Sequence, residues 1–318
     1  MRTLFIGAVC VALACAIAPL ASAKPTSGWQ WAPAPPAAIQ EVGAVVLGDK
    51  VYVAGGLGLP GQVGLFSNKQ FQFDMLTGAW SEVASFPVPV HHLQAVTTSG
   101  KIYYLGGLEG AALIPNGRVW QYDPKTNELT ERARMPQQRI RGATGAAVHD
   151  GKIYVAGGQR DYLAFGYFDE YDPATDTWTA LPDLPNPREH LGAAIVGDKS
   201  YAIGGRFVIQ PAFIRPTDVF DFSTGSWSTI GPIPHGRGGL AVVPIGDMIY
   251  AIGGEGIGPS FTDNEVLDTR SLTWSTREPM KQGRHGIQGV ASDGKIYIAG
   301  GASYSVYLPE ADMQVYVP

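Results

Sequence analysis

Four arginines recur along the chain at nearly even intervals, with histidines and carboxylates beside them. They are Arg141, Arg188, Arg237 and Arg284, which lie 47, 49 and 47 residues apart. A guanidinium binds a carboxylate or a phosphate through paired hydrogen bonds. If four such side chains converge on one axis, their like charges repel unless an anion or nearby carboxylates offset them. The spacing therefore predicts a site for an anion, or else arginines that bond loop carbonyls and hold the fold together.

Acid–base chemistry is possible at the same positions. Glu189 and His190 follow Arg188 directly, and His285 follows Arg284. A proton donor and a proton acceptor beside a carboxylate-binding arginine are what epimerisation of an acidic sugar requires. We therefore expect His190, Glu189 and His285 to be catalytic if the protein is an enzyme.

The elements that position these residues come from an internal repeat. Six times a tyrosine stands three residues before a Gly-Gly pair, and successive pairs lie 51, 51, 47, 49 and 47 residues apart. The instances are Tyr52/Gly55-Gly56, Tyr103/Gly106-Gly107, Tyr154/Gly157-Gly158, Tyr201/Gly204-Gly205, Tyr250/Gly253-Gly254 and Tyr297/Gly300-Gly301. A period near 50 that contains Gly-Gly indicates an array of repeated units. Each of the four arginines stands 16 residues before its Gly-Gly pair, so the four positions are equivalent.

Each repeat reads as four short strands. A small-apolar run leads into a turn pair such as Gly48-Asp49 or Asp150-Gly151, which tolerates the positive φ of a hairpin, and an apolar-aromatic run then ends at Gly-Gly. A third run closes on an aromatic residue and an aspartate, and in most repeats a tryptophan begins the fourth. Six repeats of four antiparallel strands predict an all-β, six-bladed propeller.

A second set of equivalent positions lies two residues beyond each arginine position. It consists of Glu41, His92, Ala143, His190, Gly239 and Gly286, and strand alternation predicts that these residues face the same way as the arginines.

The two ends of the chain predict how the ring closes. The sixth repeat stops at residues 316–318 without its threonine and tryptophan, and these appear instead at Thr26 and Trp29. Trp29 stands 26 residues before Gly55, the offset that Trp80 keeps from its own next Gly-Gly pair. We expect the N-terminal strand to complete the last blade, which leaves no exposed sheet edge there.

The repeat resembles the kelch repeat over nearly all of residues 24–318, and the resemblance implies a six-bladed kelch β-propeller. It also implies that the long loops after Gly-Gly share a face with the start of the innermost strands, so that Arg206 and Glu255 join the same channel mouth. The expected ligand-binding residues are Arg141, Arg188, Arg237, Arg284, His92, Arg206 and Glu255. A more distant similarity to N-acetylneuraminate epimerase-type kelch proteins implies activity on an acidic sugar.

The N-terminus predicts export. Arg2, the apolar stretch from Leu4 to Ile17 and the Ala21-Ser22-Ala23 site are typical of a secretory signal peptide over residues 1–23. The propeller would then occupy residues 24–318 of a secreted or periplasmic protein, and lipidation of Cys15 is the alternative. Both cysteines lie inside this signal, so the mature chain has neither disulfides nor thiolate metal sites.

Charge and spacing limit the partners. The full chain carries 23 basic and 28 acidic side chains, which excludes the basic footprint of a nucleic-acid-binding protein. The apolar N-terminal stretch is too short for a membrane span, and we expect a monomer. The histidines have no fixed metal-ligand spacing, so we predict no metal and no cofactor.

Three functions of different classes remain open. The first is an exported propeller that binds an anionic small molecule or an acidic partner segment at an Arg/His-lined channel mouth. The second is an epimerase or mutarotase for an acidic sugar. The third is a protein-interaction scaffold without catalysis, for which the apolar loop segments 57–60 and 207–209 would supply contact surface.

Overall fold

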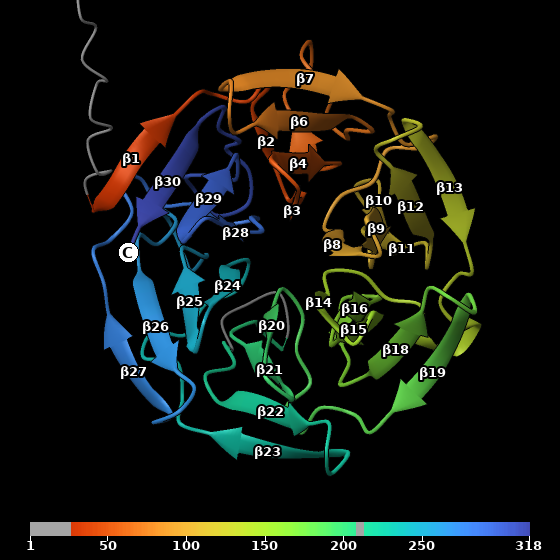
Figure 1. Ribbon diagram of the computed structural model, residues 1–318, viewed down its shortest axis with the longest axis vertical. Helices are drawn as coiled ribbons and strands as arrows, with labels where there is room; N and C mark the ends of the chain where they lie inside the picture. The colour runs from red at the N-terminus through yellow and green to blue at the C-terminus, as the bar shows by residue number, and fades with distance from the viewer. Residues whose placement is uncertain (1–26, 208–212) are drawn as a thin grey trace, which may run out of the picture.

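Six four-stranded antiparallel sheets surround a central axis in the part of the chain that the computed structural model describes, residues 27–207 and 213–318 (Figure 1). The signal peptide expected over residues 1–23 and the loop residues 208–212 lie outside it. Blades 1 to 3 consist, from the axis outward, of β3 (Gly43–Leu47), β4 (Lys50–Ala54), β6 (Gln70–Asp74) and β7 (Ala79–Val83); β8 (Gln94–Thr98), β9 (Lys101–Leu105), β12 (Val119–Asp123) and β13 (Glu128–Arg132); and β14 (Gly145–His149), β15 (Lys152–Ala156), β18 (Phe168–Asp172) and β19 (Thr177–Leu181).

The second half of the ring repeats this order. Blades 4 to 6 consist of β20 (Gly192–Val196), β21 (Lys199–Ile203), β22 (Thr217–Asp221) and β23 (Ser226–Ile230); β24 (Ala241–Ile245), β25 (Met248–Ile252), β26 (Asn264–Asp268) and β27 (Thr273–Thr276); and β28 (Val290–Ser292), β29 (Lys295–Ala299), β30 (Met313–Val317) and β1 (Gly28–Ala32). The predicted all-β, six-bladed architecture is therefore confirmed.

Burial explains the residue types of the strands. The second strand of each blade lies between two neighbouring blades, so both of its faces are covered and it is a continuous apolar run such as Val51–Ala54. The outermost strands alternate between half-buried and exposed residues. The hairpin turns have the predicted positive φ, for example 60° at Gly48 and 51° at Ser99. The core thus consists of apolar clusters between adjacent blades, and in one of them Tyr52 of blade 1 packs against Tyr122 of blade 2.

The Gly-Gly pairs bring each blade close to the next. Gly56 N donates to Val90 O at 2.8 Å, and a Cβ on Gly55 would lie 2.5 Å from the same carbonyl oxygen. With φ at 67°, Gly55 also has the conformation that glycine adopts at least cost. A side chain at this position would push neighbouring blades apart.

The N-terminal strand closes the ring as predicted. In Figure 1, β1 lies beside β30, and the two pair antiparallel with Trp29 opposite Tyr316. Four tryptophan indoles then link consecutive blades, because each donates to a carbonyl just beyond the outer strand of the preceding blade. These bonds are Trp29 to Glu278 at 2.9 Å, Trp80 to Pro33 at 2.8 Å, Trp178 to Ala133 at 2.9 Å and Trp227 to Pro182 at 2.7 Å.

One face of the propeller carries the loops after Gly-Gly and extra local structure. In each blade, the residue that directly follows the arginine position pairs with the residue that directly follows Gly-Gly. These pairs are Gln40 with Leu57, His91 with Leu108, Gly142 with Gln159, Glu189 with Arg206, Gly238 with Glu255, and His285 with Ala302. The first belongs to the ladder of β2 (Ile39–Gln40) and β5 (Leu57–Gly58), and two loops form the hairpins β10 (Leu108–Glu109)/β11 (Ile114–Pro115) and β16 (Gln159–Arg160)/β17 (Leu163–Ala164). A short 3-10 helix, η1 (Gln137–Arg139), precedes blade 3, and the described residues contain no helix long and apolar enough to cross a membrane.

Candidate functional site at the axial mouth

The four equivalent arginines lie inside the blades and do not line the mouth. Arg141, Arg188, Arg237 and Arg284 are all 0% exposed. Each forms an ion pair with a carboxylate at or just before the third strand of its own blade: Arg141 with Asp169 at 2.7 Å, Arg188 with Asp218 at 2.6 Å, Arg237 with Glu265 at 2.5 Å, and Arg284 with Asp312. Backbone carbonyls take further N–H donors, as Arg237 shows by donating to Gly253 and Ala251. The expected ring of free guanidiniums is therefore wrong, and the contacts are those of the structural alternative.

The error comes from the assumption of strand alternation. The residue two positions beyond the arginine position has a positive φ in all six repeats: 55° at Glu41, 55° at His92, 52° at Ala143, 53° at His190, and 63° at both Gly239 and Gly286. This left-handed residue turns the chain before the innermost strand begins. Consequently the arginine enters the blade while the residue two positions later lines the axis.

These six residues form a narrow backbone collar around the axis. The amides bond from blade to blade, for example His190 N to Ala143 O and Gly239 N to His190 O, both at 2.9 Å. Gly286 N continues the collar by donating to Gly239 O at 2.9 Å. Side chains at the collar therefore converge from different blades.

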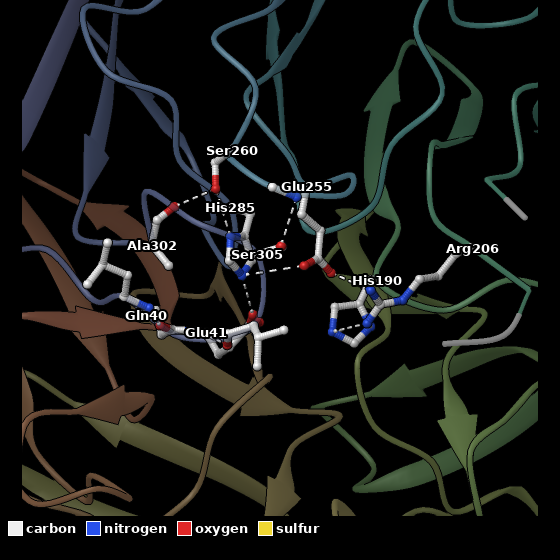
Figure 2. Close-up of polar contacts among 12 residues, drawn as sticks. Gln40, Glu41, His190, Arg206, Glu255, Ser260, His285, Ala302 and Ser305 are labelled. Carbon is white, nitrogen blue, oxygen red and sulfur yellow. Dashed lines mark hydrogen bonds and ion pairs between the residues drawn. The ribbon is translucent and has the colours of Figure 1, made fainter. Parts of the chain in front are cut away.

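A polar cluster fills the centre of this face, and we call it the axial cluster. It consists of Glu41, His91, His92, Glu189, His190, Arg206, Glu255, Ser260 and His285. Figure 2 shows Glu255 between Arg206 and His285, with Glu41 on the other side of His285. Arg206 forms ion pairs with both Glu189 and Glu255. The His285 Nε2 lies 3.6 Å from carboxylate oxygens of both Glu41 and Glu255.

A small cavity opens on the axis beside this cluster. It measures about 30 Å³ and is lined by the six collar residues, Glu41, His92 and His190 among them, and by apolar residues such as Leu93 and Leu191. This volume holds a water molecule or an ion. One potential ligand atom from each of the three side chains lies within 4.8 Å of the others.

Burial and neighbouring charges shift the protonation of the cluster. Burial lowers the pKa of His91 to about 4, and it lowers the pKa of His92 well below its usual range. Burial also favours a low pKa for His190, but the carboxylates of Glu189 and Glu41 together outweigh it and raise that pKa. Burial raises the pKa of Glu41 against the opposing effect of His190. Two histidines of the cluster, His91 and His92, therefore favour the neutral form, whereas His190 favours the protonated form beside Glu189.

The structure brings together part of the residue set expected from the sequence. His190, Glu189, His285, His92, Arg206 and Glu255 all meet at the axis, whereas the four arginines do not. Glu41, His91 and Ser260 are additional members. Glu41 occupies the repeat position of His92 and His190, so the alignment of repeats carried the signal for it, whereas no signal marked Ser260.

The long loops surround the cluster with exposed apolar side chains, which we call the apolar rim. Its members are Leu65, Ile114, Tyr162, Leu163, Phe207, Ile257, Tyr304, Val306 and Leu308. Each of the six loops after Gly-Gly contributes at least one of them. Neighbouring loops touch, since Pro259 bridges to Tyr304 and the Tyr307 hydroxyl donates to Gly58 O at 2.6 Å.

Fold and site together define a β-propeller with a polar axial mouth inside an apolar rim. Residues 132–301, more than half of the chain, match the family model described as the KLHDC2/KLHL20/DRC7 Kelch-repeats domain, and residues 40–87 match the Kelch motif. The chain belongs to the kelch-repeat family.

Similar proteins match parts of the chain. The Kelch-like protein terF of Aspergillus terreus is 38% identical over 180 residues, which cover 52% of this chain and 39% of that protein. The mouse Kelch-like protein 40 is 32% identical over 133 residues, covering 42% of this chain and 21% of that protein. The chain therefore matches well under half of each relative's length. The solved structure titled "Structure of YjhT" superposes with a TM-score of 0.75 at 19% identity, covering 88% of this chain and 95% of that one, and this likeness concerns the fold alone.

Proposed function

We propose that the propeller is an interaction module that binds a protein or peptide partner on the face bounded by the apolar rim. The observation that supports this proposal is that all six loops expose large apolar side chains around one polar centre. Ile257 is 77% exposed and Val306 is 83% exposed, on the loops of neighbouring blades. Apolar patches framed by polar groups are typical of interaction surfaces, because burying them against a partner removes apolar area from water.

The axial cluster favours a protein surface over a free acidic sugar. The 30 Å³ cavity is far smaller than the roughly 300–1,000 Å³ of pockets that enclose small organic ligands. Three carboxylates, those of Glu41, Glu189 and Glu255, face the single guanidinium of Arg206. An anion would have to approach these three carboxyl groups, and the one guanidinium is already paired with two of them, so neither an acidic small molecule nor an acidic segment is the partner that we propose.

The test compares two matched surface changes. Ile257→Glu places a charge in the apolar rim, and Leu76→Glu places one at an equally exposed residue in the turn between β6 and β7. Immobilised wild-type and variant proteins are incubated with extracts and secreted fractions of the source cells, and bound proteins are quantified by mass spectrometry. Sedimentation of the purified protein shows whether a second copy of the chain is the partner.

We expect the wild type and Leu76→Glu to retain the same partner, and Ile257→Glu to lose most of it. If Ile257→Glu and Leu76→Glu retain partners equally, the rim is not the binding surface.

A further inference from the structure

Four residues of the axial collar are not glycine although their backbone conformation favours glycine, and three of the four are polar. Glu41, His92 and His190 have φ of 55°, 55° and 53°; Ala143 has φ of 52°, and glycine occupies the equivalent positions in blades 5 and 6. A left-handed conformation costs a non-glycine residue roughly 1–2 kcal/mol. Strained residues of this kind persist where surrounding structure holds them, and they gather at functional sites. Three polar side chains, from blades 1, 2 and 4, thus stand at the axis in a backbone conformation that costs conformational energy.

Hydrogen bonds fix the orientation of the histidine rings beside the cavity. Gly110 O accepts from His91 Nε2 at 3.1 Å, so His91 Nδ1 is an acceptor, and His92 Nδ1 donates to it. His92 Nε2 then remains, 3.3 Å from a carboxylate oxygen of Glu41. The Glu189 carboxylate accepts from His190 Nδ1, and Arg206 Nη2 lies 3.3 Å from His190 Nε2, so an ion bound to that nitrogen would take the place of this guanidinium contact.

This arrangement is the one found around metal-binding histidines. Such a histidine donates its other ring N–H to a carboxylate or another acceptor, which fixes the ring and the tautomer. Here Glu189 has that role for His190, and His91 has it for His92. His285 has the same kind of partner. Ser260 Oγ donates its proton to Ala302 O at 2.8 Å, so it accepts from His285 Nδ1, which lies 3.0 Å away.

Charge and volume point the same way. Three carboxyl groups of the cluster, those of Glu41, Glu189 and Glu255, outnumber the one guanidinium of Arg206, so the cluster is rich in oxygen donors for a cation. The cavity of about 30 Å³ has room for an ion. A tetrahedral ion with ligand distances of about 2.0–2.2 Å holds its donors roughly 3.5 Å apart, so donors now within 4.8 Å need to approach by about an ångström.

We propose that Glu41, His92 and His190 form a binding site for a divalent first-row transition-metal ion on the propeller axis. Two imidazoles and one carboxylate suit Zn²⁺ or Fe²⁺ and leave further positions open toward the mouth. The sequence predicted no metal because the donors have no fixed spacing, and they come from three different blades. The site does not depend on the proposed interaction function.

The test uses the purified full chain after chelator treatment. Zn²⁺ binding is measured by calorimetry, and Co²⁺ binding by its visible absorbance. We expect one Zn²⁺ per chain, with Glu41→Gln, His92→Asn and His190→Asn each weakening binding by more than about 100-fold. Glu189→Gln removes the carboxylate that orients His190 and pairs with Arg206 but leaves all three donors in place, and it should cost about 10–100-fold.

His149→Asn is the matched control. His149 lies 3.6 Å from Asp150 and 3.7 Å from Asp198, at the end of β14 remote from the collar, and it belongs to no group of three potential ligands among the described residues. We expect the Zn²⁺ affinity of this variant to stay within about twofold of the wild type, because the substitution touches none of the three donors.

A second variant separates binding from folding. His92→Gly removes a donor and also relieves the positive-φ strain, so its melting temperature without metal should stay within a few degrees of the wild type. Zn²⁺ should raise the melting temperature of the wild type but not of His92→Gly, because only a bound ion stabilises the folded state. The proposal is overturned if the wild type shows no saturable Zn²⁺ binding, or if binding survives the three donor substitutions.

Discussion

The side-chain amide of Gln288 bonds to both backbone groups of Ala95, two blades further round the ring. Gln288 Nε2 donates to Ala95 O at 2.8 Å, and its Oε1 accepts from Ala95 N at 2.9 Å. The same oxygen accepts from Ala44 N at 3.0 Å, so one side chain ties blade 6 to blades 1 and 2. Gln288 holds the repeat position where β14 and β20 begin, and blade 6 accordingly starts its inner strand late, at Val290.

Replacing Gln288 should weaken the ring. Gln288→Leu leaves the amides of Ala44 and Ala95 without their acceptor, and we expect the free energy of unfolding to fall by about 1–3 kcal/mol. Urea denaturation measures the change. Gln72→Leu is the control, because Gln72 bonds only the exposed Ser81 and should change stability little. Equal stability of the two variants would show that the Gln288 bonds do not hold the ring.

The buried arginines should be stability residues. Arg188 and Asp218 are both fully buried and form an ion pair, so Arg188→Ala leaves a carboxylate uncompensated and should cost about 3–5 kcal/mol. Thermal and urea unfolding measure this loss. Arg270→Ala is the control, since Arg270 is exposed and pairs with Asp247 at the surface. A stable Arg188→Ala variant would contradict the structural role.

Closure by β1 depends on Trp29. Its side chain is buried, lies 5.0 Å from Tyr316 between ring centroids, and bonds Glu278 O. We expect Trp29→Ala to cost about 3–5 kcal/mol, as deletion of a buried aromatic does. Trp31, two residues along the same strand, is 52% exposed, and Trp31→Ala should be nearly neutral. Comparable unfolding curves for the two variants would argue against closure by this strand.

Stability should fall at alkaline pH. Burial raises the pKa of the six tyrosines that precede Gly-Gly above the ordinary value of 10, namely Tyr52, Tyr103, Tyr154, Tyr201, Tyr250 and Tyr297. Above pH 10 the unfolded chain loses these protons before the folded chain does. Their contribution is therefore complete below pH 10 and is lost as the pH rises. Tyrosinate absorbance should appear together with unfolding seen by circular dichroism, and tyrosinate formed in a folded protein would contradict this.

Export stays a prediction, because residues 1–23 lie outside the described structure. We expect a mature protein that begins at Lys24, which N-terminal sequencing of the exported material checks. A lipid on Cys15 would place the protein at a membrane surface instead.

The sequence was sufficient for the architecture because its signals are local. Turn pairs with positive φ, apolar second strands and Gly-Gly pairs each act within one repeat, and six copies reinforce one another. Even the closing strand could be assigned, since Trp29 keeps the offset of the other blade tryptophans. Because every repeat has the same neighbours in the ring, each one carries the same pattern of turns, apolar strands and Gly-Gly pairs, and the sequence shows that pattern directly.

The site was decided by the tertiary structure. One left-handed residue in each repeat, such as His190, turns Arg188 into its blade and points the following segment at the axis, and no alternation pattern predicts that turn. Glu41, His92 and His190 come from blades 1, 2 and 4 and meet only when the ring closes. The sequence determined which residues occupy equivalent positions, whereas the closed ring decided which of them line one cavity and interact electrostatically.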